Sequence, residues 1–268
     1  MKKKKILKNY KKIIIKSHWF LTSQVGLDCQ RLLYFLKGIL HFCVDLWKFS
    51  RKYDGPLKIC PCLHDRFEKA GATSNEYFWQ DLLVAQWVYK ANPNRHVDIG
   101  SRVDGFVANI ASFREIEVFD VRPLADEIPG VVFNQCDLMG DAHKGLNEYC
   151  DSLSCLHAIE HFGLGRYGDT IDPLGHEKGI KNMCAMLKQG GTFYLSSPIG
   201  RSRVEFNANR VFAPKDIIKI VERNGMVLHK MFAIKHGKLV KEIHLGKSEL
   251  TLSARDECCL GIFIFSKS

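Results

Sequence analysis

The sequence predicts an α/β fold, a doubly wound and mostly parallel sheet of seven strands with a helical appendage at the N-terminus. Two observations lead to this class. From about residue 96 onward, short apolar runs alternate with helical patterns, which is typical of parallel sheets with covering helices. Several runs are apolar at consecutive residues, as in strands that are buried on both faces of a sheet. The 268 residues, 46% of them hydrophobic, are enough for one such core.

The turn Asp54-Gly55-Pro56 divides the chain into an appendage, residues 1–55, and a main domain, residues 56–268. Within the main domain, Thr73-Ser74-Asn75-Glu76 indicates a capping box for a helix that continues through about Lys90. Strands are predicted at 96–100, 116–121, 131–137, 152–157 and 192–197, with helices at 105–113, 177–187 and 214–224. Two last strands, 226–235 and 259–266, could close the sheet as an antiparallel pair.

The net charge of +10 is concentrated at the N-terminus. Residues 1–58 contain twelve Lys and two Arg against three Asp, a local charge of +11, whereas the remainder carries −1. A near-neutral main domain argues against a nucleic-acid-binding face, so we expect no nucleic-acid partner. The basic tail favours contact with anionic lipid or with a phosphate-bearing partner, or it is a solvated terminus without a partner.

A helical period runs through residues 30–52. Polar residues recur at steps of three and four and leave a broad apolar face. This face consists of Leu33, Phe35, Leu36, Ile39, Leu40, Phe42, Trp47 and Phe49. It could pack on the main domain, on a second copy of the chain, or in a membrane interface, which would give peripheral membrane contact through residues 1–52.

No secretory signal is evident, and charged residues interrupt every apolar run before it could span a bilayer. Ten dilute cysteines indicate a reducing compartment. We therefore expect the protein in the cytoplasm, with a peripheral place at the inner face of the membrane as one alternative.

Candidate binding residues gather where the predicted strands end, because ligands of open α/β sheets bind outside the carboxyl ends of the strands. After the first strand, Asp98 could orient the loop or receive a cation, and two glycines, Gly100 and Gly105, would let a ligand approach the backbone. Asp120 ends the second strand and could accept both hydroxyls of a ribose. Asp137 ends the third strand and could accept an exocyclic amine of a base.

The segment Leu156-His157-Ala158-Ile159-Glu160-His161 follows the fourth strand and brings titratable groups to the same edge. These strand-end elements, in this order, resemble the class I S-adenosylmethionine-dependent methyltransferases over about residues 95–200. The resemblance implies a Rossmann-like methyltransferase fold and S-adenosylmethionine as the cofactor. It implies the cofactor-binding residues Asp98, Gly100, Ser101, Arg102, Gly105, Asp120, Asp137 and Leu156.

One position departs from the pattern of that superfamily. Arg102 stands where the usual loop has its middle glycine, and Asp104-Gly105 is displaced by one residue. The guanidinium of Arg102 could block the methionine moiety of the cofactor or could bind its carboxylate by paired hydrogen bonds.

A closer resemblance covers nearly the whole chain. Segments at 62–67, 96–106, 112–124, 161–169 and 198–212 are similar to the domain of unknown function family 268. Bacterial members of that family are often associated with surface-polysaccharide loci. The resemblance therefore implies a methyltransferase acting on a hydroxyl of a sugar or glycan precursor, free or linked to a nucleotide or lipid.

A hydroxyl acceptor needs a general base, and histidine suits this role at neutral pH. His161 is the first candidate, followed by His157 and His176, and either Glu160 or Asp172 could orient the imidazole. The alternative is that Glu160 and His161 only brace the turn after the fourth strand.

Two polar segments follow the predicted fourth and fifth strands. The glycine-rich residues 163–168, with 172–176 after them, indicate a long loop or lid over the crevice. Arg201, Arg203 and Arg210 could bind an anionic acceptor, or they could form ion pairs at the surface.

Other functions remain open at this stage. Because the glycine loop is altered, the domain could be a non-catalytic scaffold in a membrane-associated glycan assembly complex. A nicotinamide-dependent oxidoreductase would also use Asp120 for ribose, but the required Gly-x-Gly-x-x-Gly is absent. Cys60-x-Cys62-x-His64 lacks the spacing and the second ligand pair of a structural zinc site, so we expect no metal.

Overall fold

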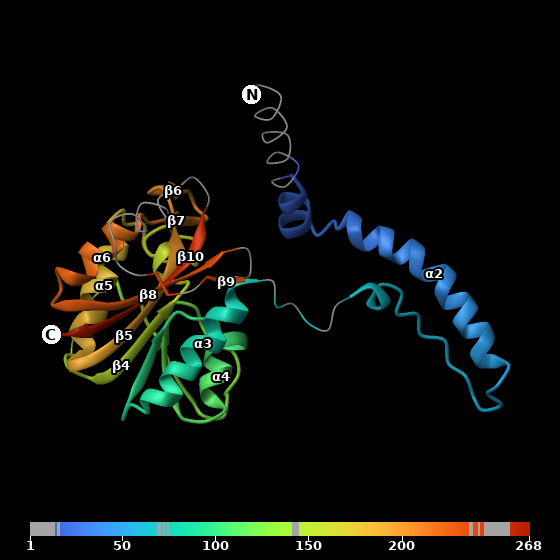
Figure 1. The fold of residues 1–268 in the computed structure, drawn as a ribbon, viewed down its shortest axis with the longest axis horizontal. Coiled ribbons are helices and arrows are strands. Elements are labelled where there is room, and N and C mark those ends of the chain that lie inside the picture. The colour runs from blue at the N-terminus through green and yellow to red at the C-terminus, as the bar shows by residue number, and fades with distance from the viewer. Residues whose placement is uncertain are drawn as a thin grey trace, which may run out of the picture. The chain divides into compact units, whose positions relative to one another are not determined.

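The computed structural model describes residues 14, 17–68, 71, 73, 75–140, 145–235, 238–240, 242–243 and 258–268. Most of the basic tail and Ser74 of the predicted capping box lie outside these residues. The chain forms two compact units, Met1–Gly71 and Ala72–Ser268. Residues 56–71 thus go with the first unit, whereas the sequence analysis placed its boundary after residue 55 (Figure 1).

The first unit contains a long helix and a segment that returns along it. Its elements are η1 (Leu21–Val25), α2 (Cys29–Ser50) and η2 (Asp65–Phe67). The ring of Phe67 stacks on Tyr34 of α2 with 5.1 Å between centroids, and Arg66 pairs with Asp45 of α2 at 3.0 Å. The predicted helix over residues 30–52 is therefore present, with one side of it covered by residues 61–67.

The second unit is built on an eight-stranded sheet in the order β3-β2-β1-β4-β5-β10-β8-β9 (Figure 1). The strands are β1 (His96–Ile99), β2 (Ile116–Asp120), β3 (Val131–Gln135), β4 (Cys150–Leu156), β5 (Leu187–Ile199), β8 (Met226–Lys235), β9 (Lys238–Val240) and β10 (Cys259–Lys267). Strands β1 to β5 pair in parallel, and β10 pairs antiparallel with both β5 and β8. The seven predicted strands and the antiparallel closure are confirmed.

Three short strands were not predicted. Strand β9 adds an eighth, antiparallel member at the sheet edge, and β6 (Arg203–Glu205) pairs with β7 (Asn209–Val211) in a separate hairpin. Each has three residues. Such a length contains too little of a two-residue alternation to be recognised in a sequence.

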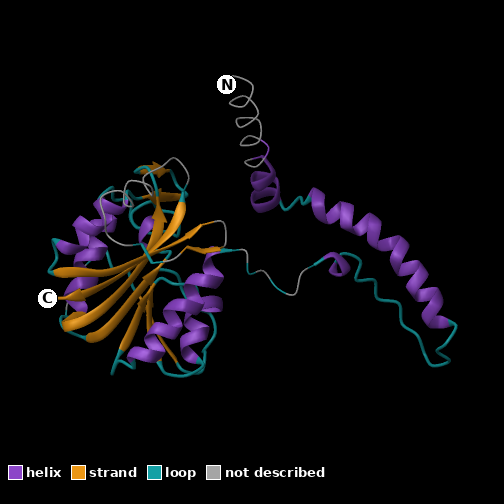
Figure 2. Cartoon of the chain, viewed as in Figure 1, coloured by secondary structure: helices purple, strands orange, loops and turns teal. Residues whose placement is uncertain are grey.

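Helices cover both faces of the sheet, as a doubly wound fold requires (Figure 2). On one face lie α3 (Glu76–Ala91), η3 (Val103–Val107) and α4 (Ala108–Ala111), which bury Val84, Phe106 and Ile110 in one core. On the other lie α5 (Gly175–Met186) and α6 (Pro214–Glu222), whose Ile180 and Ile217 belong to a second core. The predicted fold class is therefore confirmed.

Two helix starts show how local chemistry sets these elements. The side chain of Asn75 accepts a hydrogen bond from the Phe78 backbone N–H at 3.0 Å, so Asn75 caps α3. Pro214 occupies the first turn of α6, where its missing N–H costs no hydrogen bond. The predicted helix over 105–113 is instead a π-turn, η3, followed by the four residues of α4.

Candidate active site

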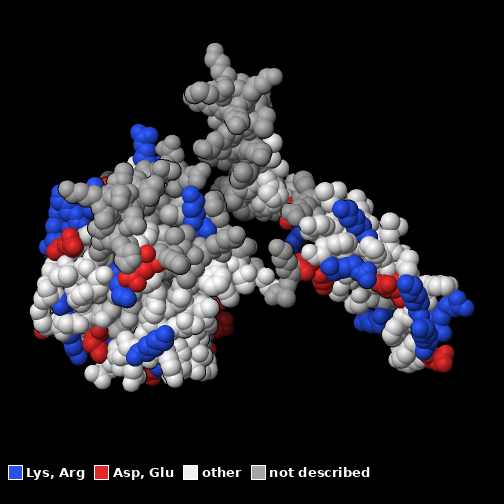
Figure 3. Space-filling view, viewed as in Figure 1, with Lys and Arg blue, Asp and Glu red and all other residues white. Residues whose placement is uncertain are grey.

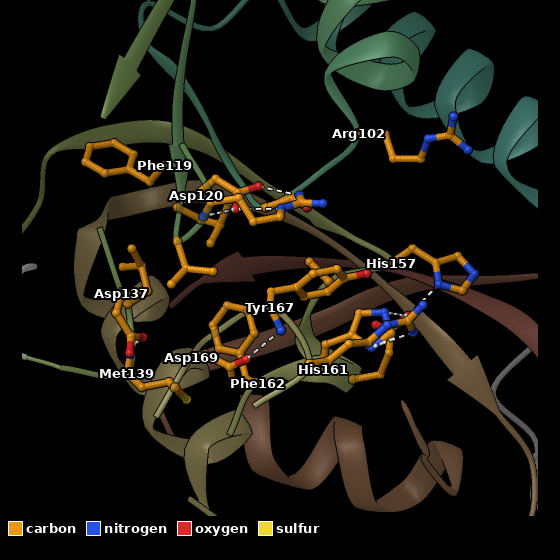
Figure 4. Close-up of a pocket in the computed structure, with 18 of the residues that line it drawn as sticks. Arg102, Phe119, Asp120, Asp137, Met139, His157, His161, Phe162, Tyr167 and Asp169 are labelled. Atoms are coloured by element: carbon orange, nitrogen blue, oxygen red, sulfur yellow. Dashed lines mark hydrogen bonds and ion pairs between the residues drawn. The ribbon is translucent and has the colours of Figure 1, made fainter. Parts of the chain in front are cut away.

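A cavity of about 390 Å³ lies at the carboxyl ends of β1, β2 and β4 and beside the loop after β3 (Figure 4). This is the edge at which open α/β sheets bind their ligands. Seven of the residues that the sequence analysis selected line it: Gly100, Arg102, Asp120, Asp137, His157, Glu160 and His161. The strand order thus brings together side chains that are up to 61 positions apart in the chain, from Gly100 to His161.

Asp120 is 7% exposed and ends β2 at the cavity wall. Its carboxylate is engaged by Arg122, which the sequence analysis did not select. The Arg122 backbone N–H and Nε donate to Asp120 Oδ1 at 2.8 and 2.9 Å, and Arg122 Nη2 donates to Oδ2 at 2.5 Å. A ligand hydroxyl at Asp120 must therefore share the carboxylate with Arg122 or displace it.

Asp137 lies on the same cavity, and its Oδ1 accepts a hydrogen bond from the Met139 N–H at 2.8 Å. The cavity also has apolar lining residues. They are Ile99, Phe119, Val121, Leu138, Met139 and Phe162. A flat apolar group with polar edges, such as a nucleobase, matches a slot of this composition.

Asp98 does not line the cavity, which corrects its predicted direct contact with a ligand. It is fully buried, and its carboxylate accepts hydrogen bonds from Ser101 N–H at 3.0 Å, Ser101 Oγ at 2.6 Å and Ser154 Oγ at 2.5 Å. Burial raises the pKa of Asp98 to about 7. Asp98 therefore orients the loop after β1, the other role that the sequence suggested for it.

Ser101 and Leu156 are corrected in the same way. Ser101 is 1% exposed, and its Oγ accepts a hydrogen bond from the Leu156 N–H at 3.2 Å, which fastens the end of β4 to the loop after β1. Neither residue lines the cavity, and their hydrogen bond positions the loop that carries Gly100.

The glycine loop differs from expectation at one of its two glycines. Gly100 has φ +71° and lines the cavity, as predicted. Gly105 does not line it, and a Cβ there would lie 2.4 Å from Asp81 Oδ2. Close packing against α3, rather than approach of a ligand, therefore explains Gly105.

Arg102 does not plug the cavity. Its guanidinium donates to both oxygens of Asp104 at 3.0 and 2.7 Å and lies over the ring of Tyr77, with 5.2 Å to the centroid. Figure 4 shows the side chain pointing away from Asp120 and Asp137. About half of it is exposed to solvent, so a negatively charged ligand group could still reach it.

His157 and Glu160 form a buried ion pair at the cavity wall. His157 Nδ1 contacts Glu160 Oε1, and the imidazole stacks on Tyr77 with 4.6 Å between centroids. Burial by itself lowers the pKa of His157, but the carboxylates of Glu160 and Glu76 together outweigh it and raise the pKa to about 9. His157 is therefore protonated at neutral pH and poorly suited as a base.

His161 is held differently. Its Nδ1 lies 2.8 Å from the Ala208 carbonyl oxygen, and because a carbonyl can only accept, Nδ1 carries the proton. Burial lowers the pKa of His161 below its usual range, so the ring is neutral near pH 7. Nε2 is then the basic nitrogen, and it lies on the side of Glu160, 3.7 Å from Oε1.

His176 and Asp172 lie away from the cavity, which corrects both as catalytic candidates. The His176 ring packs beside Phe212 with 5.5 Å between centroids, and burial lowers its pKa to about 4. The Asp172 carboxylate accepts hydrogen bonds from Lys178 Nζ at 2.6 Å and from the Leu174 N–H at 2.9 Å. Neither touches His161.

The comparisons with known proteins bear on the part of the chain that carries these histidines. Residues 132–232 match the family model described as "Caenorhabditis protein of unknown function, DUF268". The segments at 62–67, 96–106 and 112–124 lie outside the matched residues, and their resemblance to the family remains a prediction.

None of the curated proteins matches this sequence. Among solved structures, 1,6-didemethyltoxoflavin-N1-methyltransferase from Burkholderia thailandensis, with S-adenosylhomocysteine bound, is similar with a TM-score of 0.49 and 11% identity, over 81% of this chain and 93% of that one. The N-methyltransferase NodS from Bradyrhizobium japonicum is similar with a TM-score of 0.47 and 13% identity, over 73% of this chain and 99% of that one.

The residues that match this family model also contain the predicted lid. Asp169 organises this loop, because its carboxylate accepts from the backbone N–H groups of Gly163, Gly165 and Tyr167 at 2.8, 3.2 and 3.2 Å. Tyr167 lines the cavity, and its ring contacts Arg122 and the imidazole of His161 at 4.8 and 5.4 Å. The sequence indicated the loop but did not identify Tyr167, which the glycines around it hold over the site.

The three arginines past β5, Arg201, Arg203 and Arg210, do not line the cavity. Arg210 is buried and donates to the carbonyl oxygens of Phe162 and Pro173 at 2.5 and 3.2 Å. Arg203 pairs with Glu205 at 2.9 Å in the β6–β7 hairpin. The surface ion-pair alternative therefore applies to Arg203, and Arg210 braces the lid from inside.

Among the described residues, one group could in principle hold a metal ion: His64, Asp65 and Glu68. His64 Nε2 lies 3.3 Å from Asp65 Oδ1 and 3.9 Å from Glu68 Oε1. Cys60 and Cys62, which the sequence analysis considered together with His64, are not part of this group. Exposed acidic groups of this kind are common without an ion, so no metal role is assigned to it.

Proposed function

We propose that the protein is an S-adenosylmethionine-dependent methyltransferase that acts in the cytoplasm on a hydroxyl of a sugar or glycan precursor for surface polysaccharide. One observation carries the proposal. Asp120 and Asp137, from the ends of neighbouring strands, line one cavity beside Gly100, with His161 on its far wall (Figure 4). In this proposal, Asp120 accepts the ribose hydroxyls, Asp137 accepts the amine of the base, and His161 accepts the proton of the substrate.

The residues present fit a nucleoside cofactor. The positive φ of Gly100 opens the backbone at the sheet edge, and the apolar residues that line the same cavity as Asp120 and Asp137 suit an adenine ring. A volume of about 390 Å³ is within the range of small-molecule sites. S-adenosylmethionine would supply an electrophilic methyl group, and the chain would supply alignment and exclusion of water.

His161 is the general base in this proposal. With its proton on Nδ1 and its pKa lowered by burial, the ring offers an unprotonated Nε2 to an acceptor hydroxyl at neutral pH. His157 is held protonated by Glu160 and supplies fixed positive charge at the same wall. A hydroxyl acceptor is favoured because it needs a general base at neutral pH, and the imidazole of His161 would provide one at this cavity.

Calorimetric titration of S-adenosylmethionine and S-adenosylhomocysteine tests the cofactor. The parent protein should bind both, and Asp120→Ala should lose the heat of binding. Glu205→Ala is the matched control, because Glu205 also pairs with an arginine two residues away but lies outside the cavity. NADH, titrated in parallel, should give no heat.

A non-catalytic scaffold in a membrane-associated glycan assembly complex is the second candidate. The observation that favours it is the Arg122–Asp120 pair, which engages both oxygens of the proposed ribose-binding carboxylate. Absence of heat with either cofactor form, for the parent and for Arg122→Ala alike, would establish this alternative over the enzyme.

A further inference from the structure

Helix α2 presents two different faces within the first unit. Residues 61–67 cover one of them: the ring of Phe67 stacks on Tyr34, and Leu63 lies so close to Gly38 that a Cβ on this glycine would be 2.0 Å from the Leu63 carbonyl oxygen. Arg66 pairs with Asp45 on the same side. This covered face contains Tyr34, His41 and Asp45.

The opposite face is apolar and exposed. Its residues recur with a helical period, and their exposed fractions range from 37% at Ile39 to 72% at Leu40. They are Leu32, Leu33, Leu36, Ile39, Leu40, Val44 and Trp47. A contiguous apolar stripe of this length marks an interaction surface rather than ordinary exposed residues.

The charges beside this face are all positive. Lys37 and Lys48 are eleven residues apart, close to three helical turns, so they lie on the same flank of the apolar stripe. Arg51 extends beyond the helix end over the ring of Trp47, with 4.8 Å to the centroid. The one acidic residue in α2 is Asp45, and Arg66 neutralises it on the covered side.

Figure 3 shows basic side chains along this segment. We propose that α2 lies flat in the interface of a membrane that contains anionic lipids, with its apolar stripe among the acyl chains and Lys37 and Lys48 among the phosphates. No helix in the described part of the chain combines the length and apolarity that a crossing requires, which leaves in-plane binding as the mode of contact.

Charge decides between a membrane and a second copy as the occupant. Two copies of this face packed together would bring their lysines to one interface, and Asp45 is already engaged by Arg66. Lipid phosphates would neutralise the same lysines, and the remaining basic residues of the N-terminal segment, which carries a charge of +11 over residues 1–58, add to the attraction.

Vesicle flotation of the full chain tests the proposal. The protein should float with vesicles of equal parts phosphatidylcholine and phosphatidylglycerol, and much less with phosphatidylcholine alone. Leu36→Ser/Leu40→Ser should weaken partitioning by on the order of tenfold or more, since two exposed leucines no longer enter the acyl region. Lys37→Gln/Lys48→Gln should weaken it severalfold and reduce its salt dependence.

The matched control is Val132→Ser/Val227→Ser, which removes two valines that are each 45% exposed in the second unit and should float like the parent. Circular dichroism checks that the leucine variant keeps its helix. Flotation that is equal for the parent and the leucine variant overturns the proposal, as does a failure of the parent to float. A dimer in sedimentation velocity that the leucine variant abolishes would instead assign the face to a second copy.

Discussion

Arg122 holds the Asp120 carboxylate at the edge of the sheet through three hydrogen bonds, two to Oδ1 and one to Oδ2. The two residues are separated by Val121 alone, so the turn after β2 folds the guanidinium back onto the strand end. The ring of Tyr167 lies 4.8 Å from the guanidinium carbon and joins this pair to the lid. Entry of a ribose at Asp120 is therefore coupled to the position of Arg122.

Removing that guanidinium should strengthen nucleoside binding. Arg122→Ala frees both oxygens of Asp120 for a ligand. Because 41% of the Arg122 side chain is exposed to solvent, its ion pair with Asp120 is weak and competes only weakly with ligand binding. We expect S-adenosylhomocysteine to bind up to about fivefold more tightly in calorimetry. Arg203→Ala, which breaks an equally spaced pair with Glu205 outside the cavity, should leave binding unchanged. Weaker binding by Arg122→Ala would mean that Arg122 contacts the ligand itself.

Loss of the proposed base should affect turnover and leave cofactor binding intact. His161→Ala should slow S-adenosylhomocysteine formation with nucleotide-linked sugars by roughly 10²- to 10⁴-fold. His229→Ala, an exposed histidine on β8, is the control and should be silent. Because burial lowers the pKa of His161, the parent rate should already be on its plateau at neutral pH and fall only on acidification. Retained turnover in His161→Ala would remove the base assignment.

The buried Asp98 predicts a particular pH dependence of stability. Burial raises its pKa from 3.8 to about 7, so the folded protein binds this proton more tightly than the unfolded chain does. Its contribution is complete below the unfolded pKa and is lost as the pH rises through about 7. As the pH rises from 3.8 to about 7, the free energy of unfolding of the parent should therefore fall relative to that of Asp98→Asn. Urea denaturation at several pH values measures both.

The comparison with Asp98→Asn is needed because His96 acts in the opposite direction. Burial lowers the pKa of His96 to about 3, so its contribution to stability is lost as the pH falls. The asparagine variant keeps His96 and retains an oxygen for Ser101 and Ser154. Parallel pH curves for parent and variant would show that Asp98 is ionised in the folded protein throughout this range.

Two glycines with the same backbone conformation allow strain and crowding to be separated. Gly163 and Gly190 both have φ +75°. A Cβ at Gly163 would lie 2.0 Å from the Asp172 carbonyl oxygen, whereas a Cβ at Gly190 would have no other heavy atom of the described residues within 4 Å. Gly190→Ala should cost about 1–2 kcal/mol of unfolding free energy. Gly163→Ala should cost more than this, and urea denaturation measures both. Equal costs would indicate that the loop moves to accept the methyl group.

Local patterns were sufficient where one segment carries its own signal. The consecutive apolar residues of β3, β5 and β10 and the start of α3 could be assigned from sequence, and Asp120 and Asp137 fell on the predicted edge. Ligand contact could not be separated from support in this way. Asp98 precedes the last residue of β1 and pairs in register with Val118 of β2, so it lies two residues deeper in the sheet than Asp120, which ends β2 and lines the cavity.

From its sequence alone, this protein is determined to be a doubly wound α/β domain with a basic, amphipathic N-terminal segment, because hydrophobic periodicity and charge are properties of neighbouring residues. Only the tertiary structure decided the protonation states of His157 and His161, the pairing of Arg122 with Asp120 and the position of Tyr167 over the cavity. These depend on burial and on partners from other loops, and distance along the chain does not encode either quantity.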